Sequence, residues 1–316
     1  MKAWAWVRDE VHKGLFSRRT FEFFQRLRIN ITKNYHYSPI PDIRNLLDQK
    51  LWEQETSMVG VRLRESEQLA EIASVVKSYR QECHFPLDPT HIPYQYYMRN
   101  GTYGWLCATL YYSLIRHHKP LQILEIGAGQ STYIAAQAVR MNKANSINTE
   151  LITVDPDPNP VLKNGFDGVF QVIPKRAEDL SMDFFSGLRA GDILFIDSTH
   201  TVKIGGDVTY LFLEILPRLS PGVLIHLHDI FLPDHYPEKF VLNRHFFWAE
   251  QYLLQAFLTF NDHFNILWAG SYLTKKYPGI IRDIFPLPDG ISEDDAIKKY
   301  GLHYSSNSFW MQRVDR

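Results

Sequence analysis

A series of short apolar runs after residue 121 constrains the fold of this chain more than any other feature. The runs are 122–126, 151–154, 192–196, 223–227 and 264–269, and each is bounded by Gly, Pro or Asp. Strands buried on both faces have this near-continuous apolar character, and most of the runs are separated by a stretch long enough for a helix. The alternation predicts an α/β fold with a doubly wound, mostly parallel sheet. A further apolar segment, 308–314, is predicted to close the sheet.

The residues before the first run have a different pattern. Apolar residues at helical spacing predict helices over 1–34, 60–82 and 102–117. We therefore expect a helical N-terminal cap, which contributes to the substrate region, at 1–100 and the domain that carries the sheet at 101–316.

Charge and composition limit the kinds of partner that this chain is expected to bind. The 34 Lys and Arg residues against 35 Asp and Glu give a net charge of −1, which argues against nucleic acid and anionic membrane as partners. No stretch approaches the roughly 20 apolar residues of a membrane span. Only Cys83 and Cys107 are present, so we expect a reducing, cytoplasmic location. The aromatic content of 14% suits a small-molecule pocket or the interface of a homo-oligomer.

The first apolar run leads into a glycine turn and the start of a helix. Residues 125–132 are Glu-Ile-Gly-Ala-Gly-Gln-Ser-Thr. Gly127 and Gly129, on either side of Ala128, allow a tight turn and a close approach of the backbone to a ligand. Ser131 and Thr132 lie where the helix would begin, with free N–H groups and hydroxyls. The segment is a candidate cofactor loop.

An acid after the second apolar run indicates which class of cofactor the loop binds. Asp155 lies 26 residues beyond Gly129, where a carboxylate accepts hydrogen bonds from the ribose hydroxyls of an adenosine cofactor. A dinucleotide site favours a third glycine, and Thr132 occupies that position. Glu125, just before the glycines, suits a cationic ligand better than a pyrophosphate. The residues therefore favour S-adenosylmethionine, and a nicotinamide-dependent oxidoreductase remains the alternative.

Polar residues follow the fourth and fifth apolar runs. Asp197 ends the fourth run and His228-Asp229 ends the fifth, so the three converge if these strands are neighbours. Two carboxylates and an imidazole bind a divalent cation, although each residue could instead cap a helix or pack in the core. His200, three residues after Asp197, is a candidate general base for an alcohol, whose pKa is too high for it to be a nucleophile by itself.

These motifs together resemble those of class I S-adenosylmethionine-dependent methyltransferases. The likeness rests on segments 125–132, 193–197 and 222–229 and on Asp155, and it is greatest to the catechol and macrolide-sugar O-methyltransferases. The resemblance implies a seven-stranded, Rossmann-like sheet whose last strand runs antiparallel. It also implies cofactor contacts, metal ligands and a general base. By this likeness Ala177 and Glu178 line the adenine, His200 is the base, and the metal ligands are Asp197, His228 and Asp229. The further cofactor contacts are Glu125, Gly127, Ala128, Gly129, Ser131, Thr132, Asp155 and Asp197.

The expected function is methyl transfer to a hydroxyl of a small molecule, such as a sugar, polyol or other natural-product-like acceptor. His228 occupies a position where the resembling enzymes usually have an acid, so manganese, iron or zinc is as acceptable here as magnesium. N- or C-methylation and a non-catalytic binding protein on the same fold stay open. The nearly apolar helix predicted over 246–260 contains Glu250 and Gln251, which need buried partners.

Overall fold

The chain divides into two compact units in a computed structural model that describes residues 13–288 and 290–315. The smaller unit comprises Met1–Gln54 and Glu238–Phe247, and the larger comprises Glu55–Pro237 and Trp248–Arg316. Residues 55–100 thus belong to the same unit as the sheet, whereas the sequence placed a boundary at residue 100. The described elements of the smaller unit are α2 (Arg18–Arg26), α3 (Ile43–Asp48), η1 (Leu51–Glu53) and α10 (Glu238–Leu242).

The helix predicted over 1–34 is shorter in the structure. Its first part, residues 1–12, lies outside the described residues. The hydroxyl of Ser17 caps the N-terminus of α2 by accepting a hydrogen bond from the Thr20 N–H. The helix ends at Arg26, and Arg28 has a φ of 59°, a left-handed conformation that does not continue a right-handed helix.

The larger unit is built on a seven-stranded sheet in the order β3-β2-β1-β4-β5-β7-β6. All neighbouring pairs are parallel except β5–β7 and β6–β7, so the last strand runs antiparallel, as the resemblance implied. The strand β3 was not among the apolar runs, because it lies at an edge of the sheet and is only partly buried. The strands are β1 (Gln122–Ile126), β2 (Glu150–Val154), β3 (Gln171–Ile173), β4 (Ile193–Ile196), β5 (Leu224–Leu227), β6 (Phe264–Ala269) and β7 (Phe309–Arg313).

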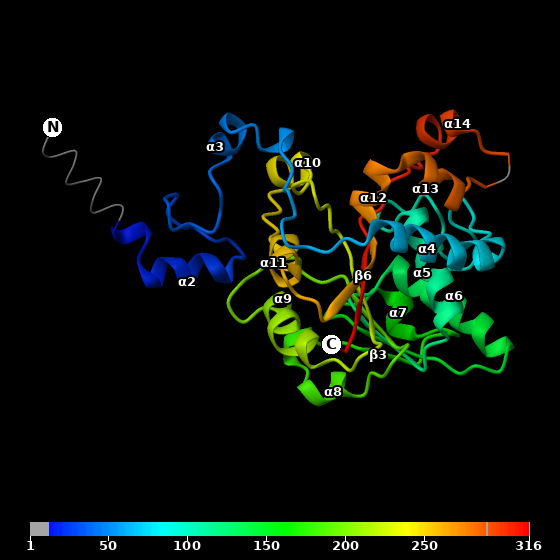
Figure 1. Cartoon of the computed structure of the whole chain (residues 1–316). Helices are drawn as coiled ribbons and strands as arrows, with labels where there is room; N and C mark the ends of the chain where they lie inside the picture. Colours follow the sequence, from blue (N-terminus) through cyan, green and yellow to red (C-terminus); the bar gives the residue numbers. More distant parts are fainter. Residues whose placement is uncertain (1–12, 289, 316) are drawn as a thin grey trace, which may run out of the picture. The chain divides into compact units, whose positions relative to one another are not determined.

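Helices cover both faces of this sheet (Figure 1). One face packs against α4, α5, α6 and α13, and the other against α8, α9, η4, η5 and α11. The helices of the larger unit are α4 (Glu65–Tyr79), η2 (Arg80–Glu82), α5 (Trp105–His118), α6 (Gln130–Ala144), α7 (Pro160–Asn164), η3 (Ala177–Asp179), α8 (Met182–Ser186), α9 (Asp207–Tyr210), η4 (Leu211–Ile215), η5 (Leu216–Arg218), α11 (Glu250–Leu258), α12 (Gly270–Lys276), α13 (Pro278–Ile284) and α14 (Glu293–Lys298). The doubly wound architecture predicted from the sequence is confirmed.

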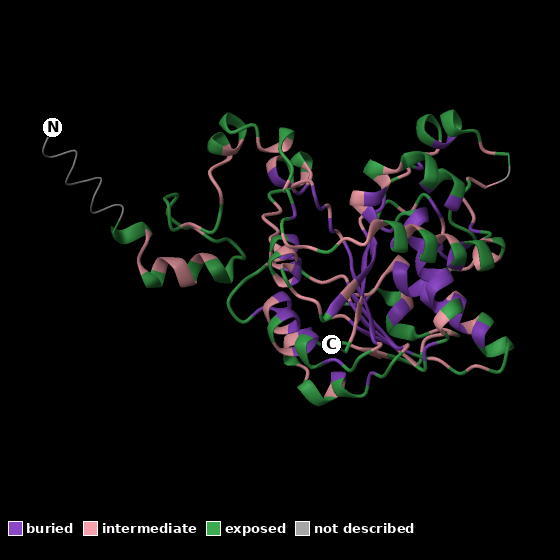
Figure 2. Ribbon diagram, in the orientation of Figure 1, coloured by how far each residue is buried: buried purple, intermediate pink, exposed green. Residues whose placement is uncertain are grey.

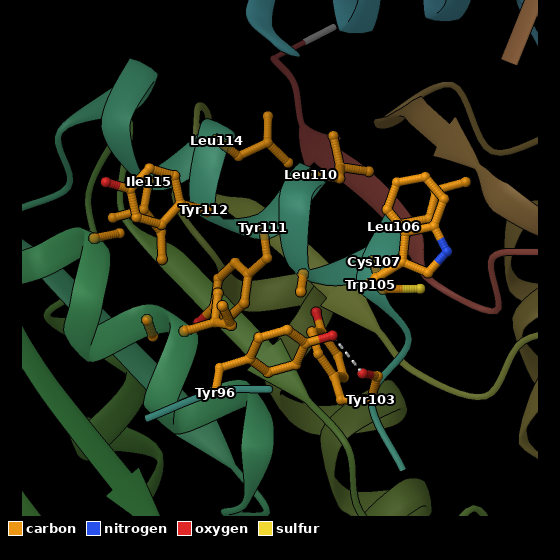
Figure 3. Close-up of a cluster of buried hydrophobic side chains, with 14 of the residues drawn as sticks. Tyr96, Tyr103, Trp105, Leu106, Cys107, Leu110, Tyr111, Tyr112, Leu114 and Ile115 are labelled. Atoms are coloured by element: carbon orange, nitrogen blue, oxygen red, sulfur yellow. Dashed lines mark hydrogen bonds between the residues drawn. The ribbon is translucent and has the colours of Figure 1, made fainter. Parts of the chain in front are cut away.

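Alternating side chains of each strand enter two separate hydrophobic cores. In β4, Ile193 and Phe195 face α5, whereas Leu194 and Ile196 face the opposite helices. The strands and α5 hold the most deeply buried residues (Figure 2). Around α5, the Tyr96 hydroxyl donates a hydrogen bond of 2.9 Å to the backbone carbonyl of Tyr103 (Figure 3). Burial on both faces explains why the strands read as continuous apolar runs.

Two further observations concern the whole described chain. Cys83 and Cys107 are both free thiols. Among the described residues, no helix combines the length and the apolar composition needed to cross a bilayer.

Candidate active site at the carboxyl edge of the sheet

The register of the sheet brings the ends of four strands to one level. Ile126 is paired with Val154 and with Ile196, and Ile196 with Leu227. Backbone hydrogen bonds then continue one residue further, from the Asp197 N–H to the Ile126 carbonyl at 2.8 Å and from the His228 N–H to the Ile196 carbonyl at 2.9 Å. The polar residues that follow these strands therefore converge at one edge, as predicted.

The glycine turn is packed tightly at its first glycine and open at its second. Gly127 has a φ of +87°, and a Cβ built there would lie 1.8 Å from the backbone oxygen of Asp197. Only glycine fits this position, because both the backbone conformation and the space exclude a side chain. Gly129 is extended, with no neighbouring atom within 4 Å of where a Cβ would be. Its N–H donates to the Thr132 hydroxyl at 3.0 Å, which ties the turn to the start of α6.

Glu125, near the end of β1 and just before this turn, has a buried carboxyl group. It is fully buried, and neither of its side-chain oxygens has a hydrogen-bond partner in the part of the chain that the structure describes. Burial raises the pKa of its carboxyl to about 8, although the nearby hydroxyls of Ser131 and Thr132 act in the opposite direction. An uncompensated buried acid is costly, so this group is poised to receive a donor or a positive charge.

The acid predicted to bind ribose holds the turn in place. The two side-chain oxygens of Asp155 accept hydrogen bonds from the N–H groups of Ala128 at 3.0 Å and Asp157 at 2.8 Å. A carboxylate has about four lone-pair sites, so further acceptance remains open to it. Ala177 and Glu178 lie in η3, which follows β3, the strand next to β2; Ala177 is buried and Glu178 half-buried.

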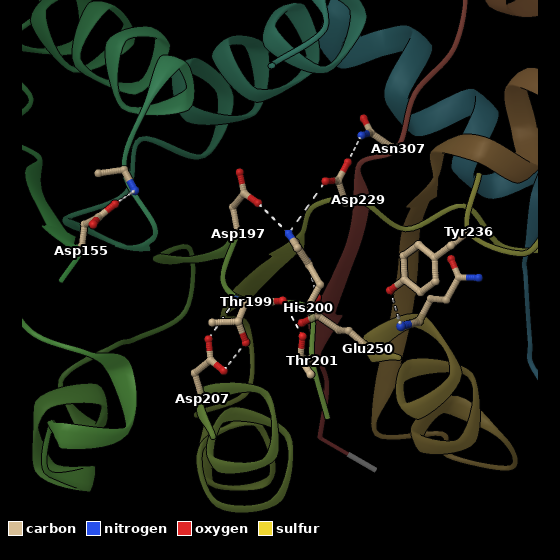
Figure 4. A network of polar contacts seen from close by, with 12 residues as sticks. Asp155, Asp197, Thr199, His200, Thr201, Asp207, Asp229, Tyr236, Glu250 and Asn307 are labelled. Atoms are coloured by element: carbon tan, nitrogen blue, oxygen red, sulfur yellow. Dashed lines mark hydrogen bonds and ion pairs between the residues drawn. The ribbon is translucent and has the colours of Figure 1, made fainter. Parts of the chain in front are cut away.

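His200 is the centre of a network of three acids (Figure 4). Its Nε2 lies 3.2 Å from Asp197 Oδ1 and 3.8 Å from Asp229 Oδ2, and its Nδ1 lies 2.8 Å from Glu250 Oε2. His200 and Asp229 both have a positive φ, 55° and 53°, which is uncommon for residues other than glycine. Strained backbone of this kind is found where a site requires a particular side-chain direction.

The charge around His200 strongly favours its protonated form. Burial alone would lower the pKa of the imidazole, but the hydrogen bonds to Asp197 and Glu250 and the charges of these acids raise it to about 10. Burial acts against ionisation of Asp197, yet His228 and His200 nearby hold the pKa of its carboxyl below the ordinary value. The site is therefore a concentration of negative charge that attracts a cation.

The structure changes the composition of the group predicted to bind a metal. Ligand atoms of Asp197, His200 and Asp229 all lie within 4.8 Å of one another, so the histidine beside the two acids is His200 and not His228. The ring of His228 is buried 4.8 Å from the Tyr103 ring, and neither of its nitrogens has a hydrogen-bond partner among the described residues. The reason is the alternation along the strand, which directs His228 to the same face as the buried His226.

Two members of the site were not assigned a role from the sequence. Asn307, in the loop before β7, donates a hydrogen bond from Nδ2 to Asp229 Oδ1. Glu250, the first residue of α11, contacts His200, which lies 50 residues earlier in the chain. The only sequence signal for Glu250 was an acid within an apolar helix; Asn307 gave none.

Comparison with known proteins agrees with this architecture. Residues 124–230 match the model of a family described as a methyltransferase domain. An uncharacterized protein of Archaeoglobus fulgidus is 30% identical over 161 residues, which cover 49% of this chain and 72% of that protein.

Two solved structures are similar to this chain at low sequence identity. The apo-structure of CmcI-N160 has 13% sequence identity and a TM-score of 0.37, over 67% of this chain and 72% of that chain. The plantazolicin methyltransferase BpumL in complex with SAH has 12% identity and a TM-score of 0.39, over 80% of this chain and 100% of that chain. The family match identifies residues 124–230 of this chain as a methyltransferase domain.

Proposed function

We propose that this methyltransferase takes its methyl group from S-adenosylmethionine and transfers it to a hydroxyl of a small molecule, with His200 as the general base. One observation carries the proposal. The imidazole of His200 faces two carboxylates at the sheet edge, and one of them, Asp197, follows the strand that packs against Gly127 of the glycine turn. A proton acceptor and a cofactor loop thus share one edge.

The residues of the turn fit S-adenosylmethionine. Gly129 leaves open space beside the backbone, and Asp155 has acceptor capacity left for ribose hydroxyls. The buried carboxyl of Glu125, which has no hydrogen-bond partner among the described residues, would be held in its ionised form by a positively charged amine, directly or through water, and so suits this cofactor better than a phosphate. We place Ala177 and Glu178 at the adenine. The chemistry that this cofactor supplies is a methyl group on a positively charged sulfur.

The acids of the site also fit a divalent cation. Asp197 and Asp229 are the oxygen donors that we propose for it, and Asn307 orients Asp229. Such a cation would acidify a hydroxyl bound to it and would offset the negative charge that raises the pKa of His200. The protein's own part is then to accept the hydroxyl proton at His200 Nε2 and to orient the acceptor molecule.

The loop 231–237 is our proposed wall of the acceptor pocket. Gln251 holds this loop, because its Oε1 accepts the Phe231 N–H at 2.9 Å and its Nε2 donates to the Asp234 carbonyl at 3.0 Å. The Tyr236 hydroxyl accepts the Gln251 N–H at 3.1 Å. A loop held so firmly beside the proton acceptor is suited to selecting the acceptor.

Replacement of Asp155 tests the cofactor assignment. We expect Asp155→Ala to weaken S-adenosylmethionine binding at least about tenfold, because each hydrogen bond to a charged group contributes about 1.5–3 kcal/mol. Isothermal titration calorimetry of S-adenosylmethionine and of NADH measures the effect. Asp157→Ala, with a 93% exposed side chain on the same loop, is the control and should bind normally. Tight binding of NADH with none of S-adenosylmethionine would refute the proposal.

Chelation tests the metal assignment separately. We expect EDTA to reduce methyl transfer to background, measured as S-adenosylhomocysteine released with a panel of sugars, polyols and catechols. Mg²⁺, Mn²⁺, Fe²⁺ or Zn²⁺ added back should restore it, whereas S-adenosylmethionine binding should be unaffected because the glycine turn contains no proposed metal ligand. Full activity after chelation contradicts the metal and leaves the methyl transfer standing.

A further inference from the structure

The start of α11 holds His200 by its ring and by its backbone. We propose that Glu250 is a positioning residue, which holds the ring of His200 by Nδ1 and so keeps Nε2 directed towards Asp197 and Asp229. The proposal rests on the proposed role of His200 as the base. In this role Glu250 affects the reaction by orienting the imidazole and not by contacting the substrate.

The geometry of the pair supports a directed hydrogen bond. Glu250 Oε2 lies 2.8 Å from His200 Nδ1, and the two residues are 1% and 4% exposed. The ring presents Nδ1 to Glu250 and Nε2 to Asp197 and Asp229, so the contact with Glu250 fixes which edge of the imidazole faces the other two acids.

The backbone around the pair makes the same arrangement rigid. The carbonyl of His200 accepts hydrogen bonds from the N–H groups of Ala249 at 2.9 Å and Glu250 at 3.1 Å. The ring of Trp248 lies 4.4 Å from the imidazole. These contacts hold a residue whose φ is +55°, so the ring direction is set by α11 and not by the local preference of the loop.

Stability does not explain an acid at this position. Buried carboxylates are costly, and apolar groups of similar volume are often neutral or stabilising in their place. The second oxygen of Glu250, Oε1, has no hydrogen-bond partner in the described part of the chain, so the acid is not compensated by a full set of bonds. We therefore attribute the presence of an acid at this position to the hydrogen bond between Glu250 Oε2 and the ring of His200.

Nuclear magnetic resonance tests the hydrogen bond without an acceptor molecule. In the metal-free protein, the Nδ1 proton of His200 should give a low-field resonance coupled to the imidazole ¹⁵N, and it should be absent in His200→Ala. We expect Glu250→Gln to shift this resonance towards higher field, because the acceptor loses its charge. Glu214→Gln, the same change on a residue whose side chain is 47% exposed, should leave it unmoved. An unchanged resonance in Glu250→Gln overturns the proposal.

Kinetics and stability then separate positioning from a structural role. For an acceptor found in the panel, Glu250→Gln should lower kcat about 10- to 100-fold, as is typical of groups that orient a functional side chain. The KM for S-adenosylmethionine and the Tm should stay close to those of the native protein. A lower Tm and a changed KM with normal kcat would mean a structural role and overturn the proposal. Absence of S-adenosylmethionine binding in the native protein would instead refute the proposed function, and the resonance test would still stand.

Discussion

Replacement of His200 by alanine should reduce methyl transfer by about 10²- to 10⁴-fold, the usual contribution of a general base. The imidazole is buried, faces Asp197 and Asp229, and is anchored by Glu250, and the methyl group of alanine offers no proton acceptor in its place. The residual activity should reflect the orientation of the two reactants, which is a separate contribution of roughly 7–11 kcal/mol. Initial rates of S-adenosylhomocysteine release measure the loss.

Two binding measurements accompany this variant. S-adenosylmethionine affinity should be unchanged, since the glycine turn and Asp155 make no hydrogen bond to His200. Mn²⁺ affinity should not fall either, because we assign the metal to the carboxylates. A large loss of Mn²⁺ binding would show that His200 is a ligand and not the base. His263→Ala, an exposed histidine at the start of β6, is the control for the loss of an imidazole elsewhere.

Replacement of Gly127 by alanine should damage both the fold and the cofactor site. The added Cβ would meet the backbone oxygen of Asp197 at 1.8 Å, and the φ of +87° is unfavourable for alanine. Backbone strain and overpacking each cost about 1–3 kcal/mol, so we expect a loss of at least about 2 kcal/mol in the free energy of unfolding. Because Asp197 must move, the variant should also lose S-adenosylmethionine binding. Urea unfolding and calorimetry measure the two effects.

Gly129 offers the matched control. A Cβ at this position meets no atom within 4 Å, and the backbone is extended, so Gly129→Ala should fold with nearly native stability. It should still bind S-adenosylmethionine less tightly, since the methyl group enters the space that we assign to the cofactor. Equal stability of the Gly127→Ala and native proteins would show that the turn relaxes freely, contrary to our expectation.

Much of the fold and the position of the glycine turn followed from the sequence. The apolar runs predicted the central strands because a strand covered on both faces consists mostly of apolar residues. Gly127 and Asp155 could be identified because turns and strand ends impose local requirements that a few adjacent residues satisfy. The edge strand β3 escaped notice, because a partly exposed three-residue strand carries little of that pattern.

Which residues surround His200 was decided only in three dimensions. The sequence correctly brought Asp197 and Asp229 to one edge, but it grouped His228 with them, whereas the structure places His200 there. The direction of His200 depends on its left-handed backbone and on Glu250, which lies 50 residues later in the chain.

Periodicity and strand ends are local properties, so the sequence by itself determined the α/β architecture, the glycine turn and the acids that follow the strands. Which side chains meet across loops depends on long-range packing, here of α11 and of the segment before β7. Such contacts leave no periodic trace in the sequence, and only the tertiary structure decided them.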